Sequence, residues 1–378
     1  MLDIDVKNGQ NLTRRNQILL PIATVRQAAS TPQLNPQLPK QIFYVFNGDA
    51  DGIIATHQLR LAHQTELADD AGATLAPVLL TGVKRDINLL DRLLNEYAAT
   101  HWATAKIYVC DISLDSNAVA LYALLDLGAT VHYFDHHRAT AYVPHTLLHA
   151  YIDTAASTCS SLIVDKFLQR QFHAWAIAAA FGDGLQPVAS KAFSNVQLAD
   201  LARIGRNMNY NAYGDRVEDL HYSPETLLAA IQDFADPLRF LVSSNIISRL
   251  ENGFNADLAL LNRVIAVEIS SHCRLWTLPD APASRRANGS FANQVAAAAP
   301  YQAHVILTPI AAITNDGEMR FSVSIRAPGI LAGAHARGAD HVAIQFATGG
   351  GRSASAGINV LPQSSISALC NSMRFTFG

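Results

Sequence analysis

The sequence has little cysteine, little charge and no long apolar run. Its 378 residues include four scattered cysteines (Cys110, Cys159, Cys273 and Cys370), and no two of them form a CxxC pair. This pattern argues against a disulfide scaffold or a zinc knuckle and fits a reducing compartment. No apolar stretch is long enough to span a bilayer, and the N-terminus lacks the basic-then-apolar pattern of a secretory signal. We therefore expect a cytoplasmic protein with no membrane partner.

The charge balance also limits the choice of partner. Charged residues make up 16% of the chain and the net charge is −3, while 49% of the residues are apolar. A chain of this composition can build real cores, and its length suggests two domains, or three if one is small. A long nucleic-acid track needs many basic contacts with phosphates, and no basic stripe is visible. A short substrate is therefore favoured over long single-stranded DNA.

The order of apolar runs predicts an α/β fold. Residues 1–38 are polar, end in a proline-dotted stretch and are expected to form an N-terminal arm. Within a first domain at 39–190, four short apolar runs alternate with segments of helical spacing; the runs cover 42–46, 77–82, 106–111 and 130–137. This alternation is typical of a parallel sheet with helices on both faces, which binds ligands beyond the carboxyl ends of its strands.

The rest of the chain changes pattern twice. From about residue 156 it turns helical, and we predict a helical linker or insert at 191–262. Strand-like runs return at 263–269, 303–310 and 319–328, followed by a glycine-rich turn at 348–357 and a last helix. We therefore predict a smaller C-terminal α/β domain at 263–378.

Acids and histidines follow three of the first four predicted strands. They are Asp49 with Asp51 after Asn47, then Asp111, then Asp135-His136-His137; Asp183 follows an apolar helix. Each acid alone could be a helix cap, and each histidine alone could be structural. Gathered at one sheet edge, however, these groups would repel one another without a cation. Carboxylate and imidazole together suit Mn²⁺ or Mg²⁺, and less clearly Zn²⁺ or Co²⁺.

In this order the motifs resemble those of the DHH phosphoesterase superfamily, whose members include RecJ-like exonucleases and nanoRNases. Gly349, Gly350 and Gly351, with Ala356-Gly357, resemble the glycine motif of its associated C-terminal domain, so the resemblance covers about residues 41–378. It implies hydrolysis of a phosphoester by metal-activated water between two cations. It also implies that Asp111 bridges the metals and that Asp49, His136 and Asp183 are terminal ligands. His137 would contact the phosphate or protonate the leaving oxygen, with Asp135 orienting a histidine.

The sequence departs from the family's pattern at two positions. Asn47 stands where an acid is usual, so it would offer a metal only a neutral amide oxygen and the first metal site should be weakened. Arg352 follows the glycines where a histidine is usual, which keeps anion binding but changes its geometry. Arg326 resembles the arginine that holds the far end of the substrate. A plain tight turn at the glycines and a surface ion pair at Arg326 are the structural alternatives.

Two further segments have both a functional and a structural interpretation. Lys84 and Arg85 follow a predicted strand and could reach a substrate, although a solvated helix start is the favoured interpretation. Residues 207–215 are rich in polar and aromatic groups that could stack a base, although a structured turn is favoured.

The predicted function is a Mn²⁺-dependent phosphoesterase that hydrolyses a short oligonucleotide or a nucleotide. One or two metal ions are expected, with Mg²⁺ or Co²⁺ as substitutes. Two alternatives remain open: a catalytically weakened DHH scaffold that binds nucleotide, nucleic acid or a protein partner, and a polyphosphatase or pyrophosphatase. The expected partner is a small phosphorylated substrate or a short single-stranded oligonucleotide, and a homodimer is left open.

Overall fold

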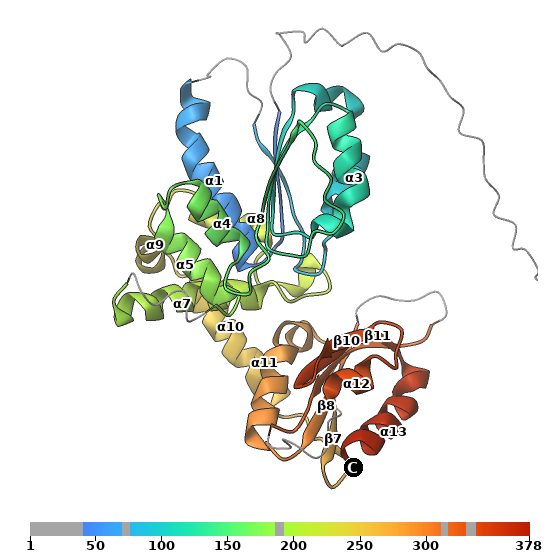
Figure 1. The fold of residues 1–378 in the computed structure, drawn as a ribbon. Coiled ribbons are helices and arrows are strands. Elements are labelled where there is room, and N and C mark those ends of the chain that lie inside the picture. Colours follow the sequence, from blue (N-terminus) through green and yellow to red (C-terminus); the bar gives the residue numbers. More distant parts are fainter. Residues whose placement is uncertain (1–40, 70–75, 186–192, 311–316, 330–337) are drawn as a thin grey trace, which may run out of the picture. The chain divides into compact units, whose positions relative to one another are not determined.

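In the computed structural model, two sheets organise the chain (Figure 1). The structure describes residues 41–69, 76–185, 193–310, 317–329 and 338–378. All of them belong to one unit, Gln37–Gly378. The predicted N-terminal arm at 1–38 lies outside the described residues, which begin at residue 41. No described helix is both long enough and apolar enough to cross a membrane.

The first sheet is entirely parallel, as predicted. Its strand order is β2-β1-β3-β4-β5. The strands are β1 (Ile42–Phe46), β2 (Val78–Leu80), β3 (Lys106–Cys110), β4 (Thr130–Asp135) and β5 (Leu148–Ile152). The sequence did not predict β5, because a loop connects it to β4 without the helix that marks the other crossovers. The carboxyl ends of β1, β3 and β4 therefore lie beside one another.

Helices cover both faces of this sheet (Figure 1). Side chains alternate along β1: Tyr44 and Phe46 join one core cluster, and Phe43 and Val45 join the other. The first face carries α1 (Ala50–Asp69), α4 (Ser160–Phe167) and α5 (His173–Gly182). The second face carries α2 (Leu89–Glu96) and α3 (Leu114–Asp126), with the 3₁₀ helix η1 (Ala99–Thr104) preceding β3. This arrangement confirms the predicted α/β class.

The predicted helical segment extends the first core. It contains α7 (Asn195–Asn211), the 3₁₀ helix η2 (Val217–Asp219), α8 (Pro224–Ile231), α9 (Pro237–Ser243) and α10 (Ile246–Leu261). Ser194 begins α7 with a capping box, and Pro224 occupies the first turn of α8. Leu201, Leu228 and Leu250 of these helices are buried in the same cluster as α1 and α5. The predicted boundary at residue 190 falls outside the described residues and stays a prediction.

The second sheet is mixed and has the order β10-β11-β9-β8-β7-β6. Its strands are β6 (Val267–Ser270), β7 (Cys273–Thr277), β8 (Ala303–Pro309), β9 (Arg320–Arg326), β10 (Gly349–Arg352) and β11 (Ser355–Pro362). Among these strands, only β7 and β8 pair in parallel. The helices α11 (Pro282–Ala298), α12 (Ala339–Ala343) and α13 (Ile366–Phe377), with the 3₁₀ turn η3 (Gln363–Ser365), complete this smaller α/β part.

The glycine-rich segment forms a β-hairpin, where the sequence predicted only a turn. β10 pairs with β11 in antiparallel register, with Gly351 opposite Ala356, and it lies at the edge of the sheet. Gly351 has a φ of 142°, and a Cβ there would lie 2.4 Å from the Cα of Ala356. Glycine is therefore required by strand pairing at this position.

Candidate active site

Three neighbouring strand ends converge on one set of polar groups. The N–H of Asn47, just after β1, donates to the carbonyl of Cys110 at the end of β3, and the N–H of Asp111 donates to the carbonyl of Phe134 on β4. These bonds hold the three loops in register at the carboxyl edge of the sheet. Asp111 has a φ of 61°, a left-handed conformation that is uncommon for residues other than glycine. Such backbone strain is often found at functional sites.

Asp111, His136 and His137 bring potential metal ligands close together. One ligand atom from each of the three lies within 4.8 Å of the others. The Oδ1 of Asp111 is 3.3 Å from the Nε2 of His136, whose Nδ1 is 4.0 Å from the Oδ2 of Asp183. Asp183 reaches this group from the C-terminal end of α5, as the residue that follows the helix. The Oγ of Ser160 also donates to the Oδ1 of Asp111, at 3.0 Å.

Asp135 is completely buried and positions the two histidines. Its Oδ1 accepts the backbone N–H of His136 at 2.9 Å and lies 2.6 Å from the Nδ1 of His137. The hydrogen bond with Asp135 raises the pKa of His137. The other oxygen, Oδ2, has no hydrogen-bond partner among the described residues although it is buried. Asp135 therefore fixes the His137 ring with its Nε2 directed away from the carboxylate.

Asp49 has partners on both carboxylate oxygens. Its Oδ1 accepts the backbone N–H groups of Asp51 and Gly52 at 3.0 and 3.1 Å, which caps α1. Its Oδ2 forms an ion pair with the ammonium of Lys84. Burial opposes ionisation, but the Lys84 charge and hydrogen bond lower the pKa of Asp49. Asp49 is therefore an ionised, paired carboxylate.

Asn47, in the loop after β1, and Asp51, in the first turn of α1, have other partners. The Oδ1 of Asn47 accepts the N–H of Asp49, and its Nδ2 donates to the carbonyl of Lys84, both at 3.2 Å. Asp51 accepts the N–H groups of Ser160 and Ser161 at 2.7 and 2.8 Å. It therefore caps α4. The predicted role of Asn47 as a metal ligand stays a prediction, and its amide is engaged by Asp49 and by Lys84 of the loop after β2.

The electrostatics of the group fit a divalent cation. Burial, followed by the charges of Asp49 and Asp51, raises the pKa of Asp111 well above its ordinary value. Burial and Asp51 likewise raise the pKa of Asp183 to about 6. Both shifts indicate more buried negative charge than the surrounding positive charge balances. Carboxylate oxygens and imidazole nitrogens are suitable ligands for Mn²⁺ and similar ions, so the residues present fit such a metal.

The fold resembles that of several solved structures over most of the chain. An exonuclease RecJ bound to manganese superposes with a TM-score of 0.53 at 16% identity, covering 90% of this chain and 91% of that one. The DHH domain of a protein described as a member of a ribosomal protein family gives 0.56 at 14% identity, covering 89% and 86%. RecJ from Thermus thermophilus, in complex with Mn²⁺, gives 0.52 at 15%, covering 89% of this chain and 52% of that one.

This chain has a DHH fold. No family model matches the sequence, and no curated protein matches it either. At these identities the likeness establishes the fold and no more. The chemistry of this chain must therefore be argued from its own residues.

Lys84 is a residue of this site that the sequence interpretation missed. The sequence favours a solvated helix start there, but the ammonium contacts Asp49 and lies 3.2 Å from the Oδ1 of Asn209. The loops after β1 and β2 can approach this closely only because residue 48 is glycine, since a Cβ there would lie 1.9 Å from the carbonyl oxygen of Gly82. In the structure β2 neighbours β1 in a parallel sheet, so the loops after both strands share one edge.

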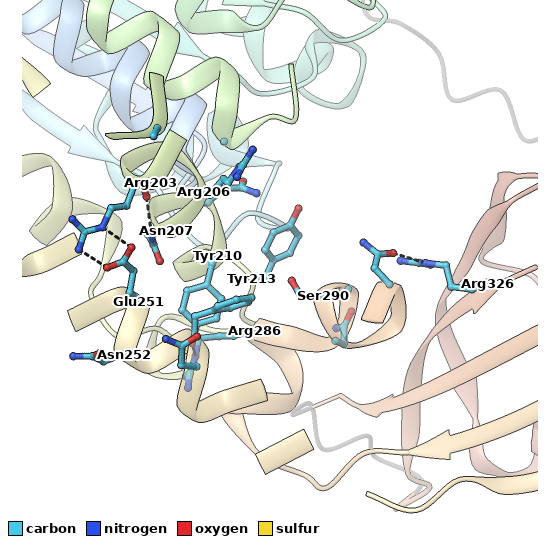
Figure 2. A pocket seen from close by; sticks show the side chains of 18 residues that line it. Arg203, Arg206, Asn207, Tyr210, Tyr213, Glu251, Asn252, Arg286, Ser290 and Arg326 are labelled. Atoms are coloured by element: carbon cyan, nitrogen blue, oxygen red, sulfur yellow. Dashed lines mark hydrogen bonds and ion pairs between the residues drawn. The ribbon is translucent and has the colours of Figure 1, made fainter. Parts of the chain in front are cut away.

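A polar cavity of about 950 Å³ adjoins these residues (Figure 2). Gly182, the neighbour of Asp183, lines it, and so does Asn209, the partner of Lys84. Further lining side chains come from α7, the loop after it, α10, α11 and β9, and include Arg203, Arg206, Asn207, Tyr210, Tyr213, Arg286 and Arg326. Segment 207–215 thus forms part of the wall, where the sequence favoured a plain turn.

The cavity arginines differ in how they are paired. Arg203 is paired with Glu251, and Arg286 with Asp257 (Figure 2 shows the first pair). Arg206 forms no ion pair with any described residue and lies 5.8 Å above the ring of Phe181. Arg326 donates to the Oδ1 of Asn293 at 2.8 Å, and burial lowers its pKa. Arg206 and Arg326 are therefore the cavity cations best placed to pair with an anion.

The predicted glycine motif lies apart from this cavity. Gly349, Gly350, Gly351 and Arg352 form the edge strand β10 and are not among the lining residues, whereas Arg326 is. The structure thus brings Asp111, His136, His137 and Asp183 together, with Asp49 and Asp135 beside them. It does not bring Arg352 to the same cavity.

Proposed function

We propose that this chain is a divalent-metal-dependent phosphoesterase that acts on a nucleotide or a short oligonucleotide. The observation that carries the proposal is the cluster of Asp111, His136 and His137 beside a cavity lined by arginines and tyrosines. A metal cluster alone fits many hydrolases, and an arginine-lined cavity alone fits any anion. Together they favour a phosphorylated substrate.

The residues that would hold the cation are Asp111, His136 and Asp183. Their oxygen and nitrogen donors fit Mn²⁺, and two of the similar RecJ structures contain manganese. When bound, such a cation supplies Lewis acidity and makes water a nucleophile near neutral pH. Mg²⁺ and Co²⁺ are the substitutes to be compared.

His137 is proposed to deliver the proton. Its Nδ1 is held by Asp135, so its Nε2 is available to a substrate. That hydrogen bond raises the pKa of His137 and so stabilises the protonated form of its ring. An imidazolium in this position can bind a phosphate oxygen and then give its proton to the leaving oxygen.

The cavity is proposed to hold the remainder of the substrate. Arg206 and Arg326 supply guanidinium groups for phosphate oxygens, and the ring of Tyr213 offers a face on which a base can stack. A volume of about 950 Å³ accommodates a ligand of one or a few nucleotides rather than a long strand.

A catalytically weakened scaffold is the second candidate. One observation favours it: Asp49, which the DHH resemblance makes a metal ligand, is already paired with Lys84. Such a protein would still bind nucleotides or a partner but would turn nothing over. Polyphosphate and pyrophosphate are the alternative substrates, because the same cationic cavity suits them.

Hydrolysis of a substrate panel tests the proposal. The purified chain is incubated with pAp, short oligonucleotides, cyclic dinucleotides, polyphosphate and pyrophosphate, with and without Mn²⁺. We expect Mn²⁺-dependent release of product from a nucleotide substrate and none from His137→Ala. Bound Mn²⁺ without turnover of any substrate would favour the scaffold, and turnover of polyphosphate or pyrophosphate alone would overturn the nucleotide assignment.

A further inference from the structure

Lys84 is held in place at both its backbone and its side chain. Its N–H donates to the carbonyl of Ala212 at 3.1 Å, and its carbonyl accepts from Asn47 at 3.2 Å. Its ammonium lies against Asp49, 3.2 Å from Asn209 and 5.2 Å from the centroid of the Tyr213 ring. Only 26% of the side chain is exposed. Both the loop after β1 and the C-terminal end of α7 therefore hold this lysine, which distinguishes it from a mobile surface lysine.

The ammonium neutralises the first of the two sets of ligands that the DHH resemblance implies. Asp49 contributes one negative charge, Asn47 contributes none, and Lys84 contributes one positive charge. Both oxygens of Asp49 and both polar atoms of the Asn47 amide are already engaged. A divalent cation at this point would have to displace the ammonium, and Asp49 together with Lys84 would offer it no net negative charge beyond that of the bridging Asp111.

The second set of ligands is different. Asp111, Asp183 and His136 face one another, and Asp135 supports them from a fully buried position. Within the described part of the chain, the lysine that lies beside these acids is Lys84, and its ion pair is with Asp49. This set therefore keeps the negative charge that attracts a metal.

We propose that this chain binds one divalent cation, at Asp111, His136 and Asp183, and that the ammonium of Lys84 takes the place of a second. A lysine supplies a fixed positive charge and three donors but cannot activate water as a metal does. Its role is to pair with phosphate oxygens and to hold Asp49. This catalytic role rests on the proposed function, whereas the number of metals does not.

Metal counting tests the number directly. The full-length chain is equilibrated with saturating Mn²⁺, and bound metal is measured by calorimetry and by mass spectrometry of the dialysed protein. We expect one Mn²⁺ per wild-type chain. Two Mn²⁺ per wild-type chain would overturn the proposal without the need for any variant.

Variants test whether Lys84 is the reason that a second metal ion does not bind. The double variant Asn47→Asp/Lys84→Gln replaces the amide of residue 47 with a carboxylate and the ammonium of residue 84 with an amide. We expect it to bind two Mn²⁺ per chain. Arg85→Gln is the matched control, because Arg85 is a half-exposed neighbour paired with Asp215, and it should keep one. A double variant that folds, as checked by circular dichroism, and still binds one Mn²⁺ would show that Lys84 does not exclude the second metal.

The two proposals fail in distinguishable ways. Two bound Mn²⁺ with nucleotide hydrolysis would overturn the single-metal inference alone. One bound Mn²⁺ without hydrolysis of any phosphorylated substrate would overturn the proposed function alone.

Discussion

At Asp111 the backbone and the side chain make separate demands. The left-handed φ of 61° favours glycine, asparagine or aspartate, whereas the buried position beside Asp49 and Asp51 disfavours a negative charge. The carboxylate is retained at a position where neutral residues would fold more easily. This conflict between local stability and charge is expected where a ligand supplies the missing positive charge.

Replacing Asp111 with Asn should separate the two demands. Asparagine tolerates the backbone conformation, so the fold is kept, but the charge that binds Mn²⁺ is lost. We expect Mn²⁺ affinity to fall by more than about a hundredfold, since outer-shell changes alone cost roughly 10–100-fold. In metal-free buffer the melting temperature should rise, because a buried repulsion is removed. Calorimetry and thermal unfolding measure both quantities.

The same exchange at an exposed acid provides the control. Asp126→Asn, at the end of α3, should change neither metal affinity nor melting temperature measurably. Unchanged Mn²⁺ affinity in Asp111→Asn would show that this carboxylate is not a ligand.

Arg326 and Arg352 test which part of the second sheet meets the substrate. Arg326 lines the cavity, and Arg352 lies on the edge strand β10. Arg326→Ala should weaken substrate binding by about 1.5–3 kcal/mol, the value of a hydrogen bond to a charged group, and leave Mn²⁺ affinity unchanged. Arg352→Ala should have the smaller effect. If Arg352→Ala weakens binding more, the glycine hairpin holds the substrate, as the sequence resemblance implied.

At the scale of the elements, α1 carries a buried histidine that makes its packing sensitive to pH. His57 is almost fully buried, its Nε2 lies 2.9 Å from the carbonyl oxygen of Phe234, and its ring meets Trp175 edge-on. Burial lowers its pKa to about 4. The unfolded chain therefore takes up a proton below an ordinary pKa of about 6.5 while the folded chain stays neutral.

This difference predicts a loss of stability in mild acid. Above the unfolded pKa, His57 is neutral in both states and does not lower stability. As the pH falls from 7 to 5, the protonation of His57 in the unfolded chain should lower the free energy of unfolding by about 2 kcal/mol. Urea unfolding at both pH values measures the change. His57→Gln keeps a donor but cannot titrate, so its loss should be smaller by that amount. Equal losses in both proteins would assign the pH dependence to other groups.

The elements that could be predicted are those whose side chains alone reveal their environment. Ile42–Phe46 is apolar throughout because both faces of β1 are covered. Leu148–Ile152 and Cys273–Thr277 were missed, because polar residues interrupt both and one of their faces is less buried. The glycine hairpin was missed because its pairing with β11 provides the order that its composition lacks.

The site divides in the same way. Asp111 and His136 could be placed together, because neighbouring parallel strands bring their carboxyl ends to one edge. The contact of Lys84 with Asp49 could not, because it depends on how two loops 35 residues apart approach through Gly48 and Gly82. No periodic signal in the sequence records such an approach.

At the scale of the whole molecule, buried ion pairs join α11 to the helical segment. Arg285 donates two hydrogen bonds to Asp219, both at 2.8 Å, and Arg286 donates two to Asp257, also at 2.8 Å. Arg285 and Asp219 are only 5% and 1% exposed. Arg286 also lines the cavity, so these pairs hold one of its walls. If the cavity binds substrate as proposed, stability and substrate binding are linked through α11.

Removing one partner should cost more than removing both. Asp219→Leu leaves the Arg285 guanidinium buried without its main carboxylate, which should destabilise the fold by about 3–5 kcal/mol. Combining it with Arg285→Met removes the stranded charge and should recover a large part of that loss. Glu96→Gln, which breaks the exposed pair with Arg92 on α2, should cost less than about 1 kcal/mol. Urea unfolding gives these values.

Because the metal ligands lie on other elements, Mn²⁺ affinity should stay unchanged in the double variant while substrate affinity falls. If the double variant is no more stable than Asp219→Leu alone, the loss comes from packing around Asp219 and not from the uncompensated charge.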